Sequence, residues 1–298
     1  MNRVLTIVVT YNGMEWIDRC LSSLVKSSVP TDVYVIDNLS IDGTPEYVRT
    51  HFPNVIFFQN ETNLGFGKGN NIGLQYALDK GYEFVYLLNQ DAWVMPDTFE
   101  KLIRISSANF EYGILSPMHL QPNMSQFETC FDEMVCSKSE GVLYQDQFFD
   151  REKQVYTVSF VQAAHWMITR ECLIKIGGFS PTFPHYGEDD NYCERVLYHG
   201  YKIGIVPSAL AIHDADAKKP KTREQVFYRI YILILHDLSN VLTQKGSLKR
   251  VFIKAILKCR RYHSFIPMEK YVKALLEIRT IRKNVELSKG DCAFLSAK

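Results

Sequence analysis

The sequence lacks the features that mark a disulfide-bonded, zinc-bound or membrane-spanning protein. Its seven cysteines are odd in number and scattered, with no Cys-x-x-Cys pair, which favours reduced thiols over disulfides or a zinc site. No apolar run approaches the ~20 residues that cross a bilayer, and the run near the start is too short for a signal peptide. We therefore expect a cytoplasmic location and leave open a peripheral attachment to the inner face of the membrane.

The sequence also has no excess of charge, no internal repeat and no low-complexity tract. Lys and Arg total 34 and Asp and Glu total 33, so the formal net charge is +1 at pH 7. Nothing in this balance favours nucleic acid as a partner. A chain of 298 residues, 46% of them hydrophobic, is long enough to build one large domain with an appendage.

Short apolar runs alternate with amphipathic stretches through the first part of the chain. Residues 4–9, 33–36, 55–58 and 84–88 are rich in branched and aromatic side chains, as are strands buried on both faces of a parallel sheet. Between the first two runs, apolar residues recur at helical spacing over residues 17–25. The alternation predicts an α/β fold with a Rossmann-like, mostly parallel central sheet flanked by helices.

Three further segments predict structure with different clarity. Thr44 followed by Pro45 predicts a short helix with Thr44 as its cap. The glycines in residues 63–71 predict a loop that brings the backbone close to a ligand. Between residues 119 and 150 the pattern fades into mixed polar and aromatic residues, and no element is predicted there.

The chain is predicted to divide into residues 1–217 and a basic helical region, residues 218–298. From Lys218 onward Lys and Arg outnumber Asp and Glu, and helical spacing continues without clear strands. Two interpretations of this region stay open. It packs as a cap on the first region or on another subunit of a homo-oligomer, or it rests on anionic lipid, as basic amphipathic helices do.

Polar side chains follow two of the predicted strands at the point where each strand ends. Asp37 and Asn38 follow the second strand, and Asn89 and Asp91 follow the fourth. The carboxyl ends of parallel strands share one edge of the sheet, which is where open α/β sheets bind ligands. We expect Asp91 to face that crevice. The alternatives are an Asp91 that caps the next helix and an Asp37 that only stabilises its own turn.

Six motifs occur in an order that is more specific than any of them alone. They are Thr10-Tyr11-Asn12-Gly13, Asp37-Asn38-x-Ser40-x-Asp42-Gly43-Thr44, Asn63-x-Gly65-Phe66-Gly67-x-Gly69-Asn70-Asn71-x-Gly73, Leu87-Leu88-Asn89-Gln90-Asp91, Gly177-Gly178-Phe179 and Glu188-Asp189. Over roughly residues 3–215 the chain resembles the family 2 glycosyltransferases of the GT-A fold. It is similar to their rhamnosyltransferase-like branch, which acts in bacterial polysaccharide assembly.

The resemblance implies an inverting, metal-dependent sugar transfer in surface polysaccharide synthesis. The donor would be a UDP- or dTDP-linked sugar, and the acceptor a saccharide or a lipid-linked molecule. Asp91 would bind Mg²⁺ or Mn²⁺ on the donor diphosphate, with His213 as a second metal ligand. Asn89 stands where relatives often carry an Asp, so the metal would be held jointly with the diphosphate, as Mg²⁺ commonly is.

The resemblance also implies which carboxylate acts as the catalytic base. Asp189, beside Glu188, would take the proton from the acceptor hydroxyl, a role worth typically ~10²–10⁴-fold in rate. Asp190 is the competitor, because an acidic run allows a slip of one residue. An acidic helix start that only complements the helix dipole is the alternative.

A set of substrate contacts follows from the same resemblance. Asp37 would accept a hydrogen bond from the nucleotide base, and Trp166 would stack on a sugar, although core packing suits Trp166 equally. A solvated Lys68 in a flexible turn is likewise an alternative to a phosphate contact. The expected substrate-binding residues are Thr10, Tyr11, Asn12, Asp37, Asn63, Lys68, Asn89, Trp166 and Asp190.

A rival hypothesis keeps the fold without the chemistry. The amide at Asn89 is compatible with a non-catalytic nucleotide-sugar-binding or scaffold protein of the same fold. The intact carboxylates Asp91, Glu188 and Asp189 favour the enzyme.

Overall fold

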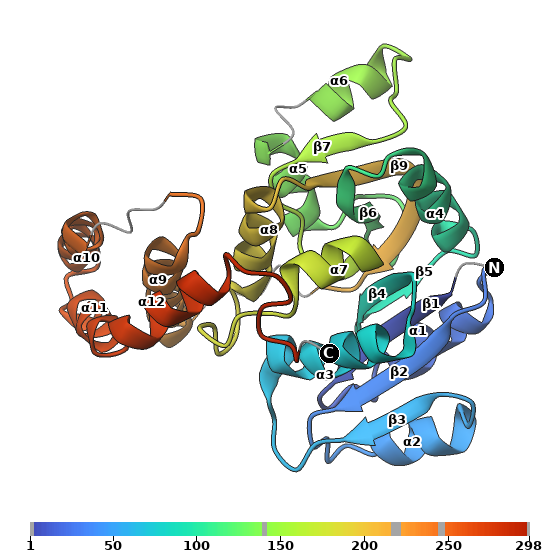
Figure 1. The fold of residues 1–298 in the computed structure, drawn as a ribbon, viewed down its shortest axis with the longest axis horizontal. Helices are drawn as coiled ribbons and strands as arrows, with labels where there is room; N and C mark the ends of the chain where they lie inside the picture. Colours follow the sequence, from blue (N-terminus) through green and yellow to red (C-terminus); the bar gives the residue numbers. More distant parts are fainter. Residues whose placement is uncertain (1–2, 139–141, 216–221, 244–247, 297–298) are drawn as a thin grey trace.

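The computed structural model describes residues 3–138, 142–215, 222–243 and 248–296. In this part of the chain nine strands form one central sheet, in the order β3-β2-β1-β4-β8-β6-β9-β5, with β7 paired to β9 (Figure 1). Helices cover both faces of the sheet, and the helices α9 to α12 project to one side (Figure 1). The predicted α/β class with a C-terminal helical extension is confirmed.

The first half of the sheet is parallel, as predicted. It contains β1 (Val4–Thr10), β2 (Asp32–Asp37), β3 (Ile56–Gln59) and β4 (Phe84–Asn89). β1 lies between β2 and β4, with Thr10 opposite Asp37 and Val9 opposite Asn89. The ends of these three strands are therefore side by side at one edge of the sheet.

The second half of the sheet is mixed. It contains β5 (Ala92–Val94), β6 (Tyr112–Leu120), β7 (Tyr156–Val158), β8 (His165–Thr169) and β9 (Lys202–His213). β8 runs antiparallel to β4 and β6, β6 runs parallel to β9, and β9 pairs antiparallel with β5 and β7. The parallel arrangement of the first half thus continues in the second half only at the β6–β9 pair.

Two hydrophobic cores hold helices on the two faces of the sheet. The first packs α1 (Ile17–Val25), α2 (Thr44–His51) and α4 (Thr98–Ala108) against β1, β2 and β4. The second packs α3 (Gly65–Lys80), α7 (Arg170–Ile176) and α8 (Glu188–Tyr198) against the other face. Side chains alternate between the two faces along each strand, so Leu5 and Ile7 belong to one core and Val4 and Val8 to the other.

The glycine-rich segment is not a loop, contrary to the prediction. Helix α3 begins at Gly65 and includes most of it. A Cβ atom on Gly69 would lie 2.9 Å from a Val9 side-chain atom, and one on Gly73 would lie 2.7 Å from Ile7. The glycines therefore allow α3 to pack closely on β1.

Two other sequence-based expectations also change. The cap of α2 is Gly43, which makes no side-chain cap, and the Thr44 hydroxyl instead accepts a hydrogen bond from Gly13 N at 3.0 Å. In the segment where no element was predicted, the structure has α5 (Thr129–Lys138) and α6 (Val142–Phe148). Only a few side chains of these two helices are buried in the main core, which explains the weak pattern.

The C-terminal helices build a third core of their own. They are α9 (Arg223–Ser239), α10 (Leu248–Tyr262), α11 (Ile266–Leu276) and α12 (Ile278–Leu287). The predicted division between residues 217 and 218 lies outside the described residues. No helix in the described ranges combines the length and apolar character that a bilayer crossing requires.

The segment after α12 returns to the sheet domain. Gly178 N donates to Ala293 O at 2.8 Å, and Cys292 N donates to Ile174 O at 2.9 Å. Ser296 N donates to Gln75 Oε1 on α3 at 2.7 Å. The C-terminal region is thus attached to the sheet domain at both of its ends, through α9 and through this tail.

Candidate active site

Two turns at the carboxyl edge of the sheet, residues 10–14 and 37–44, interlock through side chains. In each contact a side chain of one turn accepts a hydrogen bond from a backbone N–H of the other. The pairs are Asn12 N with Ser40 Oγ, Gly13 N with Thr44 Oγ1, Met14 N with Asp42 Oδ2 and Ile41 N with Asn12 Oδ1, at 2.8 to 3.0 Å. This network fixes the backbone beside β1 and β2.

Asp37 is fully buried at the centre of these turns. Its Oδ1 accepts hydrogen bonds from the hydroxyls of Thr10 and Ser40, and its Oδ2 accepts from Ser40 N and from Gln59 Nε2 at 3.1 Å. These four donors match the roughly four lone-pair sites of a carboxylate, so Asp37 holds the two turns together in this structure. Its contact with a nucleotide base stays a prediction.

The other residues predicted on the donor side lie around the same edge. The Thr10 side chain is buried, whereas Tyr11 is half-exposed. Asn63 and Lys68 are exposed at the start of α3, where Asn63 Oδ1 accepts from Gly65 N at 2.9 Å. Asn12, as described above, uses its Oδ1 to hold the second turn. Contacts of these residues with a donor stay predictions.

Asp91 lies in the turn between β4 and β5, and β5 brings it to the end of β9. Ala92 pairs with His213, and Asp214 N donates to Asp91 O at 2.8 Å. His213 Nε2 is therefore 3.6 Å from Asp91 Oδ1, with the two side chains 9% and 28% exposed. The structure thus brings together the two residues that the sequence predicted as metal ligands, although they are far apart in the chain.

A carboxylate and an imidazole are chemically suited to a divalent cation such as Mn²⁺. In the ranges that the structure describes, no third His, Cys, Asp or Glu completes a cluster around a metal. The protein would therefore supply Asp91 and His213, and the remaining ligands would be donor phosphates and water, as is usual for Mg²⁺. The donor set present fits a metal that arrives with its substrate.

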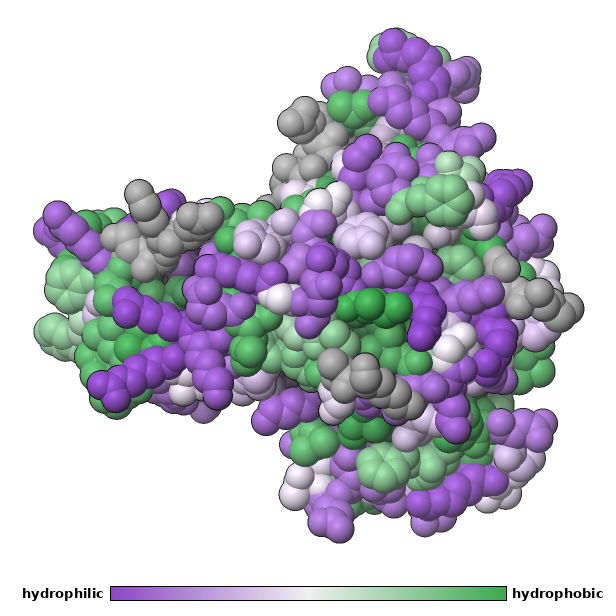
Figure 2. Space-filling model, in the orientation of Figure 1, coloured by the Kyte–Doolittle hydropathy of each residue, from purple (hydrophilic) through white to green (hydrophobic). Residues whose placement is uncertain are grey.

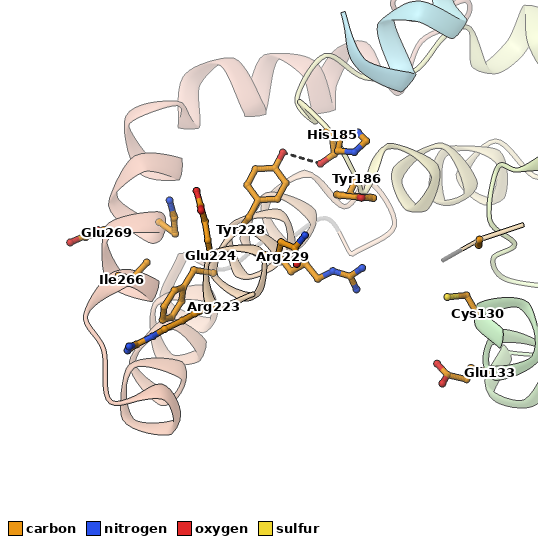
Figure 3. A pocket seen from close by; sticks show the side chains of 14 residues that line it. Cys130, Glu133, His185, Tyr186, Arg223, Glu224, Tyr228, Arg229, Ile266 and Glu269 are labelled. Atoms are coloured by element: carbon orange, nitrogen blue, oxygen red, sulfur yellow. Dashed lines mark hydrogen bonds between the residues drawn. The ribbon is translucent and has the colours of Figure 1, made fainter. Parts of the chain in front are cut away.

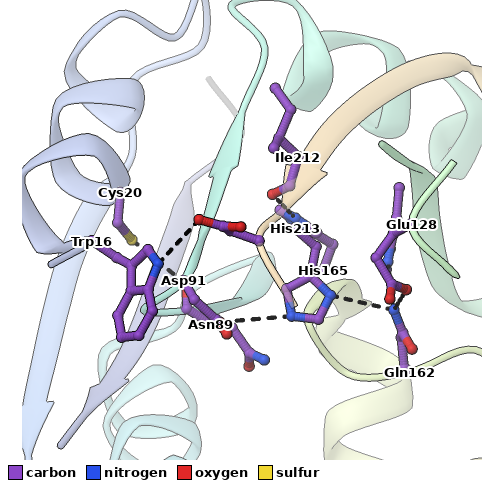
Figure 4. A network of polar contacts seen from close by, with 11 residues as sticks. Trp16, Cys20, Asn89, Asp91, Glu128, Gln162, His165, Ile212 and His213 are labelled. Atoms are coloured by element: carbon purple, nitrogen blue, oxygen red, sulfur yellow. Dashed lines mark hydrogen bonds and ion pairs between the residues drawn. The ribbon is translucent and has the colours of Figure 1, made fainter. Parts of the chain in front are cut away.

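His213 lies between Asp91 and a buried polar cluster (Figure 4). Gln162 Nε2 is 3.4 Å from His213 Nδ1, 3.2 Å from His119 Nδ1 and 2.7 Å from Glu128 Oε2. His165 accepts from or donates to Tyr86 Oη at 2.9 Å and bonds Ile212 O at 3.0 Å. Burial lowers the pKa of His165 to about 3, so this ring supports the site as a neutral group.

Residues 162–164 connect this cluster to the acidic motif. Asn89 N donates to Ala164 O at 3.1 Å, so the segment is bound to the end of β4. The backbone of Ala163 hydrogen-bonds the Asp189 carboxyl group, and Gln162 reaches His213. Three consecutive residues therefore contact His213, the end of the strand that precedes Asp91, and Asp189.

The acidic motif forms the first turn of α8. Glu188 is buried, 4% exposed, and its Oε2 has no hydrogen-bond partner among the described residues. Burial, together with the charge of Asp189, raises the pKa of Glu188 to about 8. Burial and then the charge of Asp190 raise the pKa of Asp189 to about 7. Asp189 remains partly exposed, so it combines access with a pKa suited to proton transfer near neutral pH.

A family model for glycosyl transferase family 2 matches residues 6–175, more than half of the chain. The chain belongs to glycosyl transferase family 2. A second model, described as the N-terminal domain of galactosyltransferase, matches residues 156–216. The matched regions include Asp91, residues 162–164, Asp189 and His213.

Curated relatives of this family 2 member agree with the predicted branch. An N-acetylglucosaminyl-diphospho-decaprenol L-rhamnosyltransferase of Mycobacterium tuberculosis is 25% identical over 237 residues, 72% of this chain and 76% of that protein. A dTDP-rhamnosyl transferase of Shigella flexneri is 21% identical over 226 residues, 74% of this chain and 72% of that protein. The resemblance to the rhamnosyltransferase-like branch is confirmed.

Solved structures confirm the GT-A fold. TarS of S. aureus in complex with UDP superposes with a TM-score of 0.55 at 18% identity, covering 80% of this chain and 66% of that chain. A mannosyltransferase of Pyrobaculum calidifontis in complex with GDP-Man and Mn²⁺ gives a TM-score of 0.57 at 20% identity, covering 81% and 64%. This glycosyltransferase thus spans about two thirds of each of those chains.

Trp166 does not have the place that the resemblance implied. Its side chain is fully buried, its Nε1 donates to Val161 O at 3.1 Å, and its ring packs against Phe179 and Tyr192. The ring has no exposed face for a sugar. Trp166 is therefore a core residue of this glycosyltransferase, as the alternative interpretation had it.

A groove of about 1160 Å³ lies between the sheet domain and the C-terminal helices. In Figure 3, Arg229 of α9 points towards Cys130 and Glu133 of α5, and Tyr186 lies between the two sides. Tyr228 Oη donates to His185 O at 3.0 Å, which fixes the loop just before the acidic motif. The groove is thus lined by residues next to the predicted base.

Sequence analysis missed two glutamines of the site. Gln90 Oε1 accepts from Tyr11 N at 2.9 Å and its Nε2 donates to Tyr11 O at 3.2 Å, so it clamps the first turn to the Asp91 turn. Gln90 lies inside a quoted motif, which was a usable signal. Gln162 lies outside every motif, and only the fold brings it to His213.

Proposed function

We propose that this glycosyltransferase catalyses an inverting transfer of a sugar from a nucleoside diphosphate to a saccharide or lipid-linked acceptor. The observation that carries the proposal is the connection through residues 162–164, which ties Asp91 and His213 on one side to Asp189 on the other. A site for the donor diphosphate and a base for the acceptor are then close enough to serve one reaction. The process would be surface polysaccharide synthesis on the cytoplasmic side, as the sequence resemblance implies.

The donor diphosphate would bind at the carboxyl edge of the sheet, with its nucleoside near Tyr11 and the start of α3. Asp91 and His213 would hold Mg²⁺ or Mn²⁺ there. When bound, this metal would neutralise charge that builds up on the diphosphate leaving group. A UDP- or dTDP-linked donor is proposed, because TarS was solved with UDP and the Shigella relative is named for dTDP-rhamnosyl transfer.

The acceptor would be activated by Asp189. Its carboxylate takes the proton of the acceptor hydroxyl while the hydroxyl oxygen forms a bond to the anomeric carbon. The bond from that carbon to the diphosphate oxygen breaks, and its electron pair leaves with the diphosphate. One in-line displacement inverts the configuration. Glu188 is buried, and its pKa of about 8 keeps it protonated near neutral pH. It therefore adds no second negative charge beside this base.

A thermal-shift screen of UDP-, dTDP- and GDP-sugars, each with and without Mn²⁺ or Mg²⁺, tests donor binding. A ligand that binds only the folded state raises the melting temperature by mass action, and we expect the largest shift for one pyrimidine nucleotide sugar with metal. No metal-dependent shift for any donor would contradict the site.

Product configuration tests the reaction itself. We expect NMR of the product anomeric proton to show inversion with an accepted donor and acceptor, and retention would contradict the single displacement. Donor binding without either transfer or hydrolysis across a panel of acceptors would instead support the non-catalytic binding function.

A further inference from the structure

We propose that the outward face of α10 is a membrane-docking surface whose partner is an anionic lipid bilayer. The helix has the sequence LKRVFIKAILKCRRY, which contains no Asp or Glu. Its basic residues are Lys249, Arg250, Lys254, Lys258, Arg260 and Arg261. A helix of this charge next to lipid headgroups of opposite charge is attracted to them, whatever the net charge of the whole chain.

Apolar side chains occupy the same outward face. Phe252, Ile253, Ile256 and Leu257 are 40%, 47%, 38% and 57% exposed, while Val251 on the opposite side is buried in the core of the C-terminal helices. With 3.6 residues per turn, the four exposed side chains lie together, and Lys249 and Arg260 lie among them. An apolar face edged by Lys and Arg is the pattern of helices that lie in a membrane interface.

A groove between α9 and α10 extends this surface. It has a volume of about 360 Å³, and its lining combines Leu233 and Leu257 with Lys258 and Arg261. Lys254 in the same lining is paired with Asp237 at 2.6 Å, so the other basic residues carry the attraction. Leu233 of α9 is 51% exposed. Basic groups beside an apolar floor match a lipid, which presents a phosphate above its acyl chains.

The same face fits other partners less well. A symmetric dimer would place α10 against α10 or its surroundings in an isologous contact, and the basic helices would repel each other. Nucleic acid would attract the charges but would leave the four apolar side chains in water. Figure 2 shows green and purple surface side by side on the lobe that carries α10 and α11. A bilayer with anionic headgroups uses both features at once.

Vesicle co-sedimentation of the full chain tests the proposal. We expect binding to vesicles of phosphatidylcholine mixed with phosphatidylglycerol, weak binding to phosphatidylcholine alone, and loss of binding as salt is raised. The double variant Ile253→Glu/Leu257→Glu should lower the partition coefficient more than tenfold. Arg260→Glu or Arg261→Glu should each lower it by about fivefold or more, the expected effect of one basic group at such a surface.

Matched controls use exposed residues on the sheet domain. Phe110→Glu introduces the same charge at a site that is 82% exposed, and Lys26→Glu reverses a charge on the exposed end of α1. Both should bind vesicles as the parent chain does, and thermal unfolding should show that every variant is folded. Vesicle binding is measured without donor or acceptor, so its result is separate from that of the proposed transfer.

Three outcomes would overturn the proposal. They are absence of binding to anionic vesicles, equal losses in the control variants, and equal binding to neutral and anionic vesicles. Sedimentation velocity provides a further check. A dimer that Leu257→Glu dissociates, in a chain that does not bind vesicles, would show that the face joins two copies instead.

Discussion

The turns around Asp37 and the helix α8 differ in whether their buried polar atoms have hydrogen-bond partners. The Asp37 carboxylate has four donors from the protein. On α8, by contrast, Glu188 Oε2, Asn191 Oδ1, Glu194 Oε2 and Arg195 Nε are buried without a partner among the described residues. Buried groups without partners are costly. The Asp37 carboxylate is thus fully paired before any ligand binds, whereas α8 keeps single buried polar atoms without a partner among the described residues.

The pKa values of carboxyl groups are displaced on the α8 side. Burial raises the pKa values of both Glu188 and Asp189, and a neighbouring carboxylate adds to each rise: Asp189 for Glu188 and Asp190 for Asp189. Perturbed acids of this kind concentrate at sites of proton transfer. We therefore propose that the first region positions the donor and that the second carries the proton transfer.

The largest expected effect is on the α8 side. Asp189→Asn should reduce the turnover number by ~10²–10⁴-fold, because the base is lost while its shape is kept. Donor-induced thermal shifts should be unchanged. The matched variant Asp190→Asn should keep most activity. If Asp190→Asn is the inactive variant and Asp189→Asn is active, the roles of the two residues are exchanged.

Asp91→Asn should have the next largest effect. We expect transfer to fall by roughly 10²–10³-fold, because stabilisation of leaving-group charge is lost. The metal-dependent part of the donor thermal shift should also disappear. Glu100→Gln, an exposed carboxylate on α4, is the control and should change neither measurement. A full metal-dependent shift in Asp91→Asn would remove Asp91 from the metal site.

Asp37→Asn tests the rigidity of the donor side. The amide nitrogen would face Ser40 N or Thr10 Oγ1, which are donors themselves, and the unfolding free energy should fall by about 1–3 kcal/mol. Chemical denaturation measures this loss. The Michaelis constant for the donor should rise more than the turnover number falls, because the turns bind rather than react. Gln59→Ala, which removes one of the four donors, should show a smaller loss of the same kind.

Glu188→Gln tests the raised pKa of Glu188 and has the smallest expected effect on transfer near neutral pH, where Glu188 is already neutral. Because the pKa of Glu188 is raised from 4.5 to about 8, the folded protein retains a proton that the unfolded chain loses at lower pH. The stability that the Glu188 carboxyl group contributes is complete below about pH 4.5 and is lost as the pH rises to about 8. Glu188→Gln should therefore unfold like the parent at low pH and be more stable above about pH 8. Parallel stability curves would contradict the raised pKa.

Local pattern was enough for much of the fold. The run from Phe84 to Leu88 is apolar throughout because β4 is buried on both faces, and the predicted strand and the position of Asp91 after it follow directly. The same pattern failed at Gly65, Gly67 and Gly69. Glycine is a poor helix former in isolation, and only the folded structure explains these three: Gly69 packs against Val9 of β1, Gly67 against Phe179, and Gly65 has a positive φ beside Pro184 O.

The sequence predicted the charged residues of the candidate site but not the residues that hydrogen-bond to them. Asp91, His213 and Asp189 each belong to a motif or a strand end. Gln162 acts through contacts with Glu128 and His213, which are distant in sequence, and no local spacing indicates them. The burial of Trp166 was equally unpredictable, because the sequence around a lone aromatic residue does not show whether its ring packs in the core or faces a ligand.

The return of the tail to α3 and α7 has a consequence for how the protein is made. Gln75 and Ser296 are separated by 221 positions, and a Cβ atom on Gly177 would lie 2.1 Å from Ala293 O. During synthesis, which proceeds from the N-terminus, the sheet domain can assemble while this patch is still bare. The tail covers this surface of α3 and α7 only after all four C-terminal helices have emerged from the ribosome. The nascent enzyme therefore passes through a stage in which its sheet domain is folded but still lacks its contacts with the tail.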